Sequence, residues 1–232
     1  MVTFKGLSLK DAAPVRISNI YVESPKVATT IKERPVARGE NFVRRKYSPR
    51  LIIIEFYFPQ TYPTQKAQWF QRVSAWTHSN GPQELRLPNF PGKFIKAACT
   101  ALPDLSAISK MDMMQIEFTA FDPAFVSETV KTAACGASFT VGGDLPALAY
   151  IQKVNASPIS SPAWVLDSSH TIALSGTIAS GTLKVDLEDK VITLNGTPIM
   201  DKMTLQSRFF EIEPGTHTVT GTGDVYIQER WL

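Results

Sequence analysis

Three histidines carry the side chains best suited to proton transfer at neutral pH, because imidazole titrates at about pH 6.5. They are His78, His170 and His217. None stands in a short motif with a serine, a cysteine or a carboxylate, and the chain contains no G-x-S-x-G, H-E-x-x-H or P-loop sequence. We interpret each as an exposed turn or helix-end histidine, and the sequence predicts that the protein is not an enzyme.

Three carboxylates near the C-terminus have the chemistry of a glycosidase pair, in which one group is the acid and the other the base or nucleophile. They are Glu211, Glu213 and Asp224. Glu211 and Glu213 alternate with Phe210 and Ile212, however, and this spacing is typical of the solvent-facing side of a strand. We therefore interpret them as surface carboxylates.

A second acidic group, Asp186, Glu188 and Asp189, offers the oxygen ligands that Ca²⁺ prefers. A tight hairpin explains the same residues, because aspartate and the nearby Asn195-Gly196 pair both favour turns. We favour the hairpin.

The two cysteines, Cys99 and Cys135, lie far apart and match neither a disulfide framework nor a zinc motif. We interpret them as buried free thiols of a chain that is made in a reducing cytoplasm. The sequence therefore predicts no metal and no cofactor.

Aromatic residues in the second half offer a different function, which is to stack on sugar rings. Trp164 and Trp231 are the candidate glycan contacts, and Phe209 and Tyr226 are further aromatic residues of the same half that could stack on sugars. Aromatic residues of a β-sandwich are more often part of the core. A carbohydrate-binding module that recognises host cell-wall glycans is thus the alternative function.

The composition is that of a soluble globular protein, with 44% apolar and 19% charged residues, and it excludes wholesale disorder. Charge is unevenly distributed along the 232 residues. Residues 1–134 carry 18 Lys and Arg against 11 Asp and Glu, whereas residues 135–232 carry 6 against 10. Halves of opposite sign indicate two domains with different surroundings.

The apolar segments of the chain predict neither a membrane span nor a signal peptide. The longest apolar run, Leu51 to Phe58, is too short to span a bilayer and contains Glu55. The first fifteen residues include Lys5, Lys10 and Asp11 and have no apolar core.

Residues 24–50 form the most informative charged segment, which we call the arm. A turn is expected at Arg38-Gly39, so the segment reads as a long β-hairpin with few apolar anchors. One interpretation is contact with a polyanion or with acidic surfaces of partner subunits, and the other is a solvated hairpin. The basic residues of the arm are Arg34, Arg38, Arg44, Arg45, Lys46 and Arg50.

Most other segments predict strands. One helix is expected at about residues 64–79, where Trp69, Phe70, Val73 and Trp76 share one face. The expected strands are 4–7, 16–22, 51–58, 84–87, 94–100, 113–121, 171–174, 182–187, 190–194, 209–212, 216–221 and 225–228.

The segment 127–147 is rich in small residues and is the expected domain boundary. The predicted fold is mainly β. Residues 1–136 form a β-sandwich-like domain with one helix and the protruding arm, and residues 137–232 form an antiparallel β-sandwich.

In this order, these segments resemble the distal tail protein (Dit) family of long-tailed, non-contractile bacteriophages. The resemblance spans nearly the whole chain. The residues that carry it are Phe4-Lys5-Gly6, Arg34 to Asn41, Leu51 to Phe58, Trp69 to Trp76, Phe118 to Pro123, Leu183 to Asp186, Val191 to Gly196, Phe210 to Gly215 and Arg230-Trp231-Leu232.

The resemblance implies a structural hub of the phage tail tip. Family members form a homo-hexameric ring in which the arm embraces the neighbouring subunit, so the six basic residues of the arm are expected at the oligomer interface. The expected partners are the tail tube protein, the end of the tape measure, the tail-tip protein and receptor-binding or baseplate proteins. DNA would pass through the ring without specific binding, and the protein would reside in the virion.

The resemblance also implies a galectin-like C-terminal domain. Sugar-binding galectins carry a His-x-Asn-x-Arg stretch, and neither His170 nor His217 begins one. The galectin-like shape is therefore expected to be a scaffold, since a fold alone does not establish a function.

Overall fold

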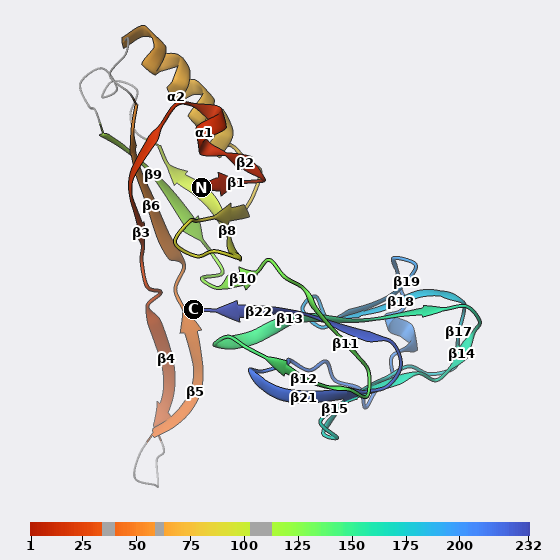
Figure 1. Ribbon diagram of the computed structural model, residues 1–232. Coiled ribbons are helices and arrows are strands. Elements are labelled where there is room, and N and C mark those ends of the chain that lie inside the picture. The colour runs from red at the N-terminus through yellow and green to blue at the C-terminus, as the bar shows by residue number, and fades with distance from the viewer. Residues whose placement is uncertain (34–39, 59–62, 103–112) are drawn as a thin grey trace. The chain divides into compact units, whose positions relative to one another are not determined.

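The computed structural model describes the chain except residues 34–39, 59–62 and 103–112, together with the side chains of residues 30–33, 40–45 and 63–64. The expected turn at Arg38-Gly39 lies outside the described residues. The chain divides into two compact units, Met1–Phe125 and Val126–Trp231 (Figure 1).

The first unit is built mainly from antiparallel strands. The elements are β1 (Thr3–Phe4), β2 (Leu7–Ser8), α1 (Leu9–Ala12), β3 (Arg16–Val22), β4 (Val27–Glu33), β5 (Glu40–Tyr47), β6 (Arg50–Tyr57), α2 (Pro63–Thr77), β7 (Gln83–Arg86), β8 (Lys93–Ala101) and β9 (Met113–Ala120). Neighbouring strands pair in the order β3-β6-β9-β8-β7-β1-β2.

The core of this unit follows from strict alternation on β6 and β9. Ile52, Ile54 and Phe56 are fully buried on β6, and each faces a β9 residue across an antiparallel ladder. Ile54, for example, pairs with Ile116. Alternation places every second side chain on one face of a strand, so the sequence pattern alone sets the buried face.

Helix α2 supplies the other side of that core. Trp76 is 4% exposed, and its ring lies 5.7 Å from the ring of Phe4 and 6.0 Å from that of Phe118. Its indole Nε1 donates to the carbonyl of Leu7 at 2.8 Å. The expected helix is confirmed. The one-turn helix α1 was not expected, because four residues are too few to show a helical period.

The second unit is a two-layer sandwich. One sheet has the order β11-β22-β13-β18-β19-β20, and the other has the order β12-β21-β15-β16. The elements are β11 (Lys131–Ala134), β12 (Ser138–Val141), β13 (Leu145–Asn155), β14 (Ile159–Ser160), β15 (Ala163–Leu166), β16 (His170–Ala173), β17 (Thr177–Ile178), β18 (Gly181–Asp186), β19 (Val191–Leu194), β20 (Thr197–Pro198), η2 (Met200–Lys202), β21 (Gly215–Thr220) and β22 (Asp224–Trp231); β10 (Phe125–Ser127) spans the division between the units.

Apolar side chains from both sheets fill the space between the layers. Ile151, Val185 and Ile227 come from the first sheet, and Trp164 and Val219 come from the second. The predicted mainly β fold, with one long helix, a hairpin and a C-terminal antiparallel sandwich, is confirmed.

Several strands of this unit, among them β11, β12, β13 and β15, were not expected, and one expected strand does not form. The long strand β13 was not expected, because Pro146 and several alanines weaken its β signal. Residues 209–212 form no strand, although Phe210 and Ile212 are buried and a single bridge joins Ile212 to Ala147. Alternating burial therefore reflects an extended segment that packs on the core without a ladder partner.

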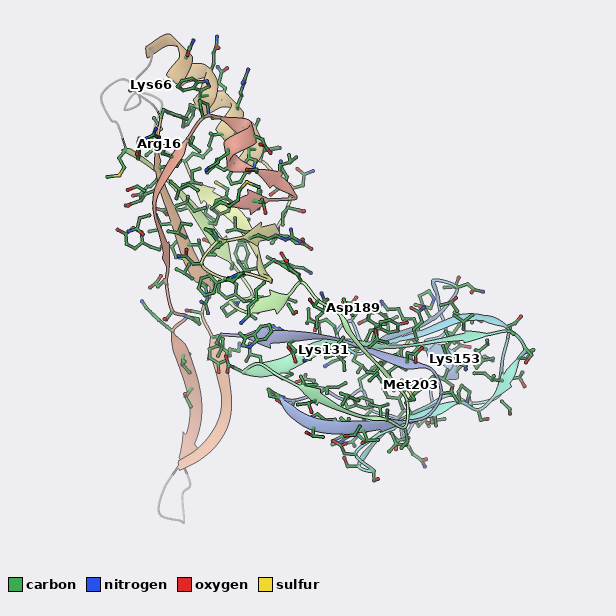
Figure 2. The ribbon with its side chains drawn as sticks, viewed as in Figure 1. Arg16, Lys66, Lys131, Lys153, Asp189 and Met203 are labelled. Carbon is green, nitrogen blue, oxygen red and sulfur yellow. The ribbon has the colours of Figure 1, made fainter. Side chains whose placement is uncertain are left out.

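The division between the units lies after Phe125 rather than after residue 136. The reason is β11, which pairs with β22 from Lys131↔Ile227 to Ala134↔Asp224. The ammonium of Lys131, labelled in Figure 2, also bonds the carboxylate of Glu229. The small residues between 127 and 136 are thus part of the C-terminal sandwich.

Candidate functional site

The arm is a two-stranded antiparallel hairpin formed by β4 and β5, which begins with Val27↔Tyr47 and ends with Glu33↔Glu40. Neither strand pairs with another strand of the described chain. At the base of the arm, Lys26 and Ser48 hold the two strands together, since Lys26 N donates to Ser48 Oγ at 2.8 Å and Ser48 N donates to the carbonyl of Lys26 at 2.9 Å.

The described side chains of the arm are mostly exposed. Val27 is 53% exposed, and Lys46 is exposed as well. Arg44 and Arg45 lie on β5 opposite Thr30 and Thr29, but their side chains are outside the description. The outer edges of β4 and β5 have no strand partner in the described chain, and an unpaired strand edge is a surface to which another chain can bind.

Two of the six expected interface residues, Arg34 and Arg38, lie outside the described residues. A third, Arg50, corrects the expectation. It is 5% exposed, and its guanidinium lies 5.1 Å from the centre of the Phe125 ring, which stacks on Phe90 at 4.2 Å. Burial lowers the pKa of Arg50. Arg50 is thus a buried residue of the unit rather than part of the surface of the arm, because it is the first residue of β6.

His217 and Asp167 form a pair that sequence reasoning missed. His217 Nδ1 lies 2.6 Å from Asp167 Oδ2, and Nε2 lies 2.8 Å from the carbonyl oxygen of Glu213. The bond to His217, followed by one from the backbone N–H of Thr218, lowers the pKa of Asp167. These residues are fifty positions apart in the chain, so no local motif could have indicated them.

The His217–Asp167 pair resembles two members of a catalytic triad, but its geometry does not suit catalysis. The nitrogen that would accept a proton from a nucleophile, Nε2, faces the carbonyl oxygen of Glu213. A carbonyl has no proton to give. The pair instead fastens the turn after β15 to β21.

Trp164, one of the two candidate glycan contacts, is 1% exposed and lies in the core of the sandwich. Its Nε1 donates to the carbonyl of Thr222 at 2.8 Å. Gly221 permits this packing, because a Cβ there would lie 2.6 Å from the indole ring. Trp164 therefore cannot contact a sugar, which corrects the expectation. Trp231 is half-buried, and its role as a glycan contact stays a prediction.

The acidic candidates are surface and turn residues, as interpreted from the sequence. Glu211 and Glu213 are exposed on either side of buried Ile212. Asp186 accepts hydrogen bonds from the ammonium of Lys184 at 2.8 Å and from the backbone N–H groups of residues 188 and 189 at 3.1 Å. Burial opposes ionisation of Asp186, but these bonds outweigh it and lower the pKa. Among the described residues, no group of three or more acidic, His or Cys side chains is placed to hold a metal ion.

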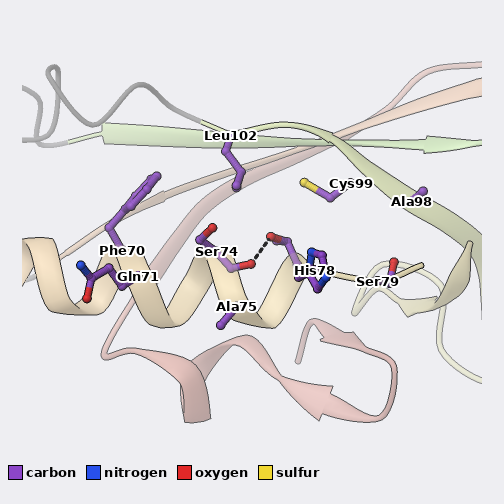
Figure 3. Close-up of a pocket in the computed structure, with 10 residues that line it drawn as sticks. Phe70, Gln71, Ser74, Ala75, His78, Ser79, Ala98, Cys99 and Leu102 are labelled. Carbon is purple, nitrogen blue, oxygen red and sulfur yellow. Dashed lines mark hydrogen bonds between the residues drawn. The ribbon is translucent and has the colours of Figure 1, made fainter. Parts of the chain in front are cut away.

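A cavity of about 640 Å³ lies between α2 and β8 in the first unit (Figure 3). His78 and Cys99 both line it. Burial raises the pKa of the Cys99 thiol, and Cys99 Sγ lies 3.7 Å from the carbonyl of Ala101. A thiol is a weak nucleophile unless it is ionised, so burial leaves Cys99 a poor nucleophile.

The helices that the structure describes include none with the length and hydropathy of a membrane span.

Residues 142–231 match the family model described as the siphovirus-type tail component, C-terminal domain. The matched residues lie within the C-terminal unit. The match covers β13, β15, β18, β21 and β22, which come from both layers of the sandwich. The resemblance to the distal tail protein family that the sequence showed is thus confirmed.

Solved structures extend the comparison to the whole fold. The chain is similar to the crystal structure of Dit from phage SPP1, with a TM-score of 0.79 and 15% identity over 100% of this chain and 98% of that chain. That protein is described as a paradigm of the hub adsorption apparatus in phages that infect Gram-positive bacteria. At this identity the likeness establishes the fold.

A chain of the phage P2 baseplate, in its activated conformation with Ca, is also similar. Its TM-score is 0.54 at 9% identity, over 94% of this chain and 91% of that chain. The same baseplate with Sr gives a TM-score of 0.50 at 10% identity, over 94% and 91%. No curated protein matches the chain by sequence.

Proposed function

We propose that this siphovirus-type tail component is a structural hub of a phage tail tip that assembles as a hexameric ring. The ring would join the tail tube to the host-adhesion device and let DNA pass without specific binding. The proposal gives the protein a structural role rather than an enzymatic one and places it in the virion after synthesis in the host cytoplasm.

The observation that carries the proposal is the arm. Its two strands pair only with each other among the described strands, and the apolar side chain of Val27 is exposed there. A hairpin of this kind gains little from its own fold, because an isolated two-stranded hairpin is marginally stable. A neighbouring subunit would cover it, and a head-to-tail contact of this type forms a ring when the rotation between subunits closes.

The charge distribution supports the same assembly. The first 134 residues carry the excess of Lys and Arg, whereas residues 135–232 carry an excess of Asp and Glu. We propose that five cations of the arm pair with acidic groups of the neighbouring subunit. They are Arg34, Arg38, Arg44, Arg45 and Lys46. The tail tube protein, the end of the tape measure, the tail-tip protein and baseplate or receptor-binding proteins are the proposed further partners.

Light scattering coupled to size exclusion tests the ring. We expect a hexamer, or a mass that climbs toward one with protein concentration and falls with added salt. Arg45→Glu and Lys46→Glu should lower the mass, whereas Lys10→Glu, a charge reversal at an exposed residue of α1, should not. A monomer at every concentration and salt, also in the presence of the tail tube protein, would contradict the proposal.

A further inference from the structure

The second unit contains a polar hollow of about 590 Å³ that is separate from the arm and from the His217–Asp167 pair. One wall is the turn after β15 together with the start of β16, and the other wall is the loop that follows η2. The residues that line it are Ser169, His170, Thr171, Leu205, Gln206 and Arg208.

The two walls are fixed to each other by hydrogen bonds between the loop and β16. Thr204 N donates to the carbonyl of Ala173 at 3.0 Å, and Arg208 N donates to the carbonyl of Thr171 at 3.0 Å. Between them, Ser207 Oγ accepts from Ala173 N at 2.8 Å. The hollow is therefore built into the fold, and the side chains that project into it start from positioned backbone.

The hollow is cationic within a unit that carries an excess of acidic residues. Arg208 is exposed, and its guanidinium donates to no group of the described chain. The carboxylate of Asp167 interacts electrostatically with His170, but its two oxygens already accept hydrogen bonds from Thr218 N and His217. The donors of Arg208 are thus available to an anion from solution.

Ser169 positions the ring of His170. Ser169 Oγ lies 3.2 Å from the carbonyl oxygen of Leu166 and 2.8 Å from His170 Nδ1. Because Nδ1 is engaged by Ser169, Nε2 is the ring nitrogen that can contact an anion in the hollow.

We propose that this hollow binds the phosphate group of a phosphate ester. The guanidinium of Arg208 and the ring of His170 would donate to the phosphate oxygens from the two walls, with the hydroxyl of Thr171 between them. Leu205, whose side chain is fully exposed at the rim, would contact the carbon part of the ester. This site goes beyond the ring and does not depend on it.

Nuclear magnetic resonance of the histidine ring protons in the full chain tests the proposal. The probe is dimethyl phosphate, which carries one negative charge at neutral pH, at constant ionic strength. We expect the ring signal of His170, assigned by its loss in His170→Gln, to shift as dimethyl phosphate is added.

Matched variants and a second anion make the test specific. Arg208→Gln should weaken binding by about tenfold, whereas Lys202→Gln, which removes an exposed charge from the same loop region, should leave binding within about twofold. No shift of the His170 signal, equal weakening in both variants, or equally tight binding of acetate would overturn the assignment. None of these outcomes bears on the oligomeric mass, which is measured separately.

Discussion

Lys46 and Arg50 both lie near the base of the arm, and the sequence gives no reason to treat them differently. The structure separates them, since Lys46 is exposed whereas Arg50 is 5% exposed beneath Phe125. Nε and Nη2 of Arg50 have no hydrogen-bond acceptor among the described residues. A buried guanidinium held by a ring and without a carboxylate costs free energy, so it depends on the packing around it.

Charge reversal at these two residues should therefore have opposite consequences. We expect Lys46→Glu to change the free energy of unfolding by less than about 0.5 kcal/mol, because surface substitutions seldom exceed that value. Arg50→Glu should destabilise the fold by about 3 kcal/mol or more, because it buries an unpaired carboxylate. Urea denaturation measures both. Arg50→Met is the control for volume, and equal stability of the two glutamate variants would refute this assignment.

Asp167 provides the second test at the scale of residues. Its pKa is lowered mainly by the bond to His217, so the folded state favours the carboxylate. The stability that this provides is complete above the ordinary aspartate pKa of about 4 and is lost as the pH falls through the lower folded value.

Asp167→Asn should consequently flatten the dependence of the melting temperature on pH below about pH 4. Thermal unfolding followed by circular dichroism between pH 2.5 and 6 measures the effect. Asp201→Asn, at an exposed residue of η2, is the matched control and should keep the acid slope of the parent chain. Parallel curves for parent and Asp167→Asn would refute the role of the pair.

Local sequence patterns predicted the surroundings of some residues and not of others. Glu211 and Glu213 were correctly interpreted as surface groups, because apolar and polar residues that alternate in an extended segment indicate which side faces solvent. Trp164 and Arg50 were misassigned, because burial at those positions depends on partners far away in the chain, Thr222 and Phe125. Pairing across such separations has no signature in a short window of sequence.

At the scale of elements, α2 shows why the helix could be predicted in detail. Four apolar residues recur at helical spacing, and the structure places Phe70, Val73 and Trp76 in the buried core. Trp69 is only half-buried at the edge, against Phe58 at 5.6 Å. In contrast, β13 was missed because its inward residues include Ala147 and Ala149, which carry little strand preference.

The two tryptophans of α2 should thus differ in their contribution to stability. We expect Trp76→Ala to lower the free energy of unfolding by about 3–5 kcal/mol, because it removes a buried ring and the bond from Nε1 to Leu7. Trp69→Ala should cost about half as much, since part of its ring already faces solvent. Chemical denaturation distinguishes them, with Gln71→Ala at an exposed position of the helix as control. A larger loss at Trp69 would contradict this account of the helix face.

At the scale of the whole molecule, the two units have separate cores, and the sequence placed their boundary in the segment that contains β11. The structure assigns β11 to the C-terminal unit, where it pairs with β22. Lys131 on β11 bonds Glu229, which is 8% exposed and also accepts from Gly142 N at 2.6 Å. The segment of small residues was interpreted as a linker, but it contains β11, which is an edge strand of the sandwich.

Two truncated chains decide between the boundaries. A chain of residues 126–232 keeps β11, whereas a chain of residues 137–232 lacks it and leaves the buried carboxylate of Glu229 without its ammonium partner. We expect the shorter chain to be less stable by on the order of 2 kcal/mol, from the lost ion pair and the lost cross-strand pairs. Urea denaturation of both chains measures the difference, and Lys131→Ala in the longer chain separates the ion pair from the strand. Equal stability of the two chains would show that β11 adds nothing to the sandwich and would restore the boundary after residue 136.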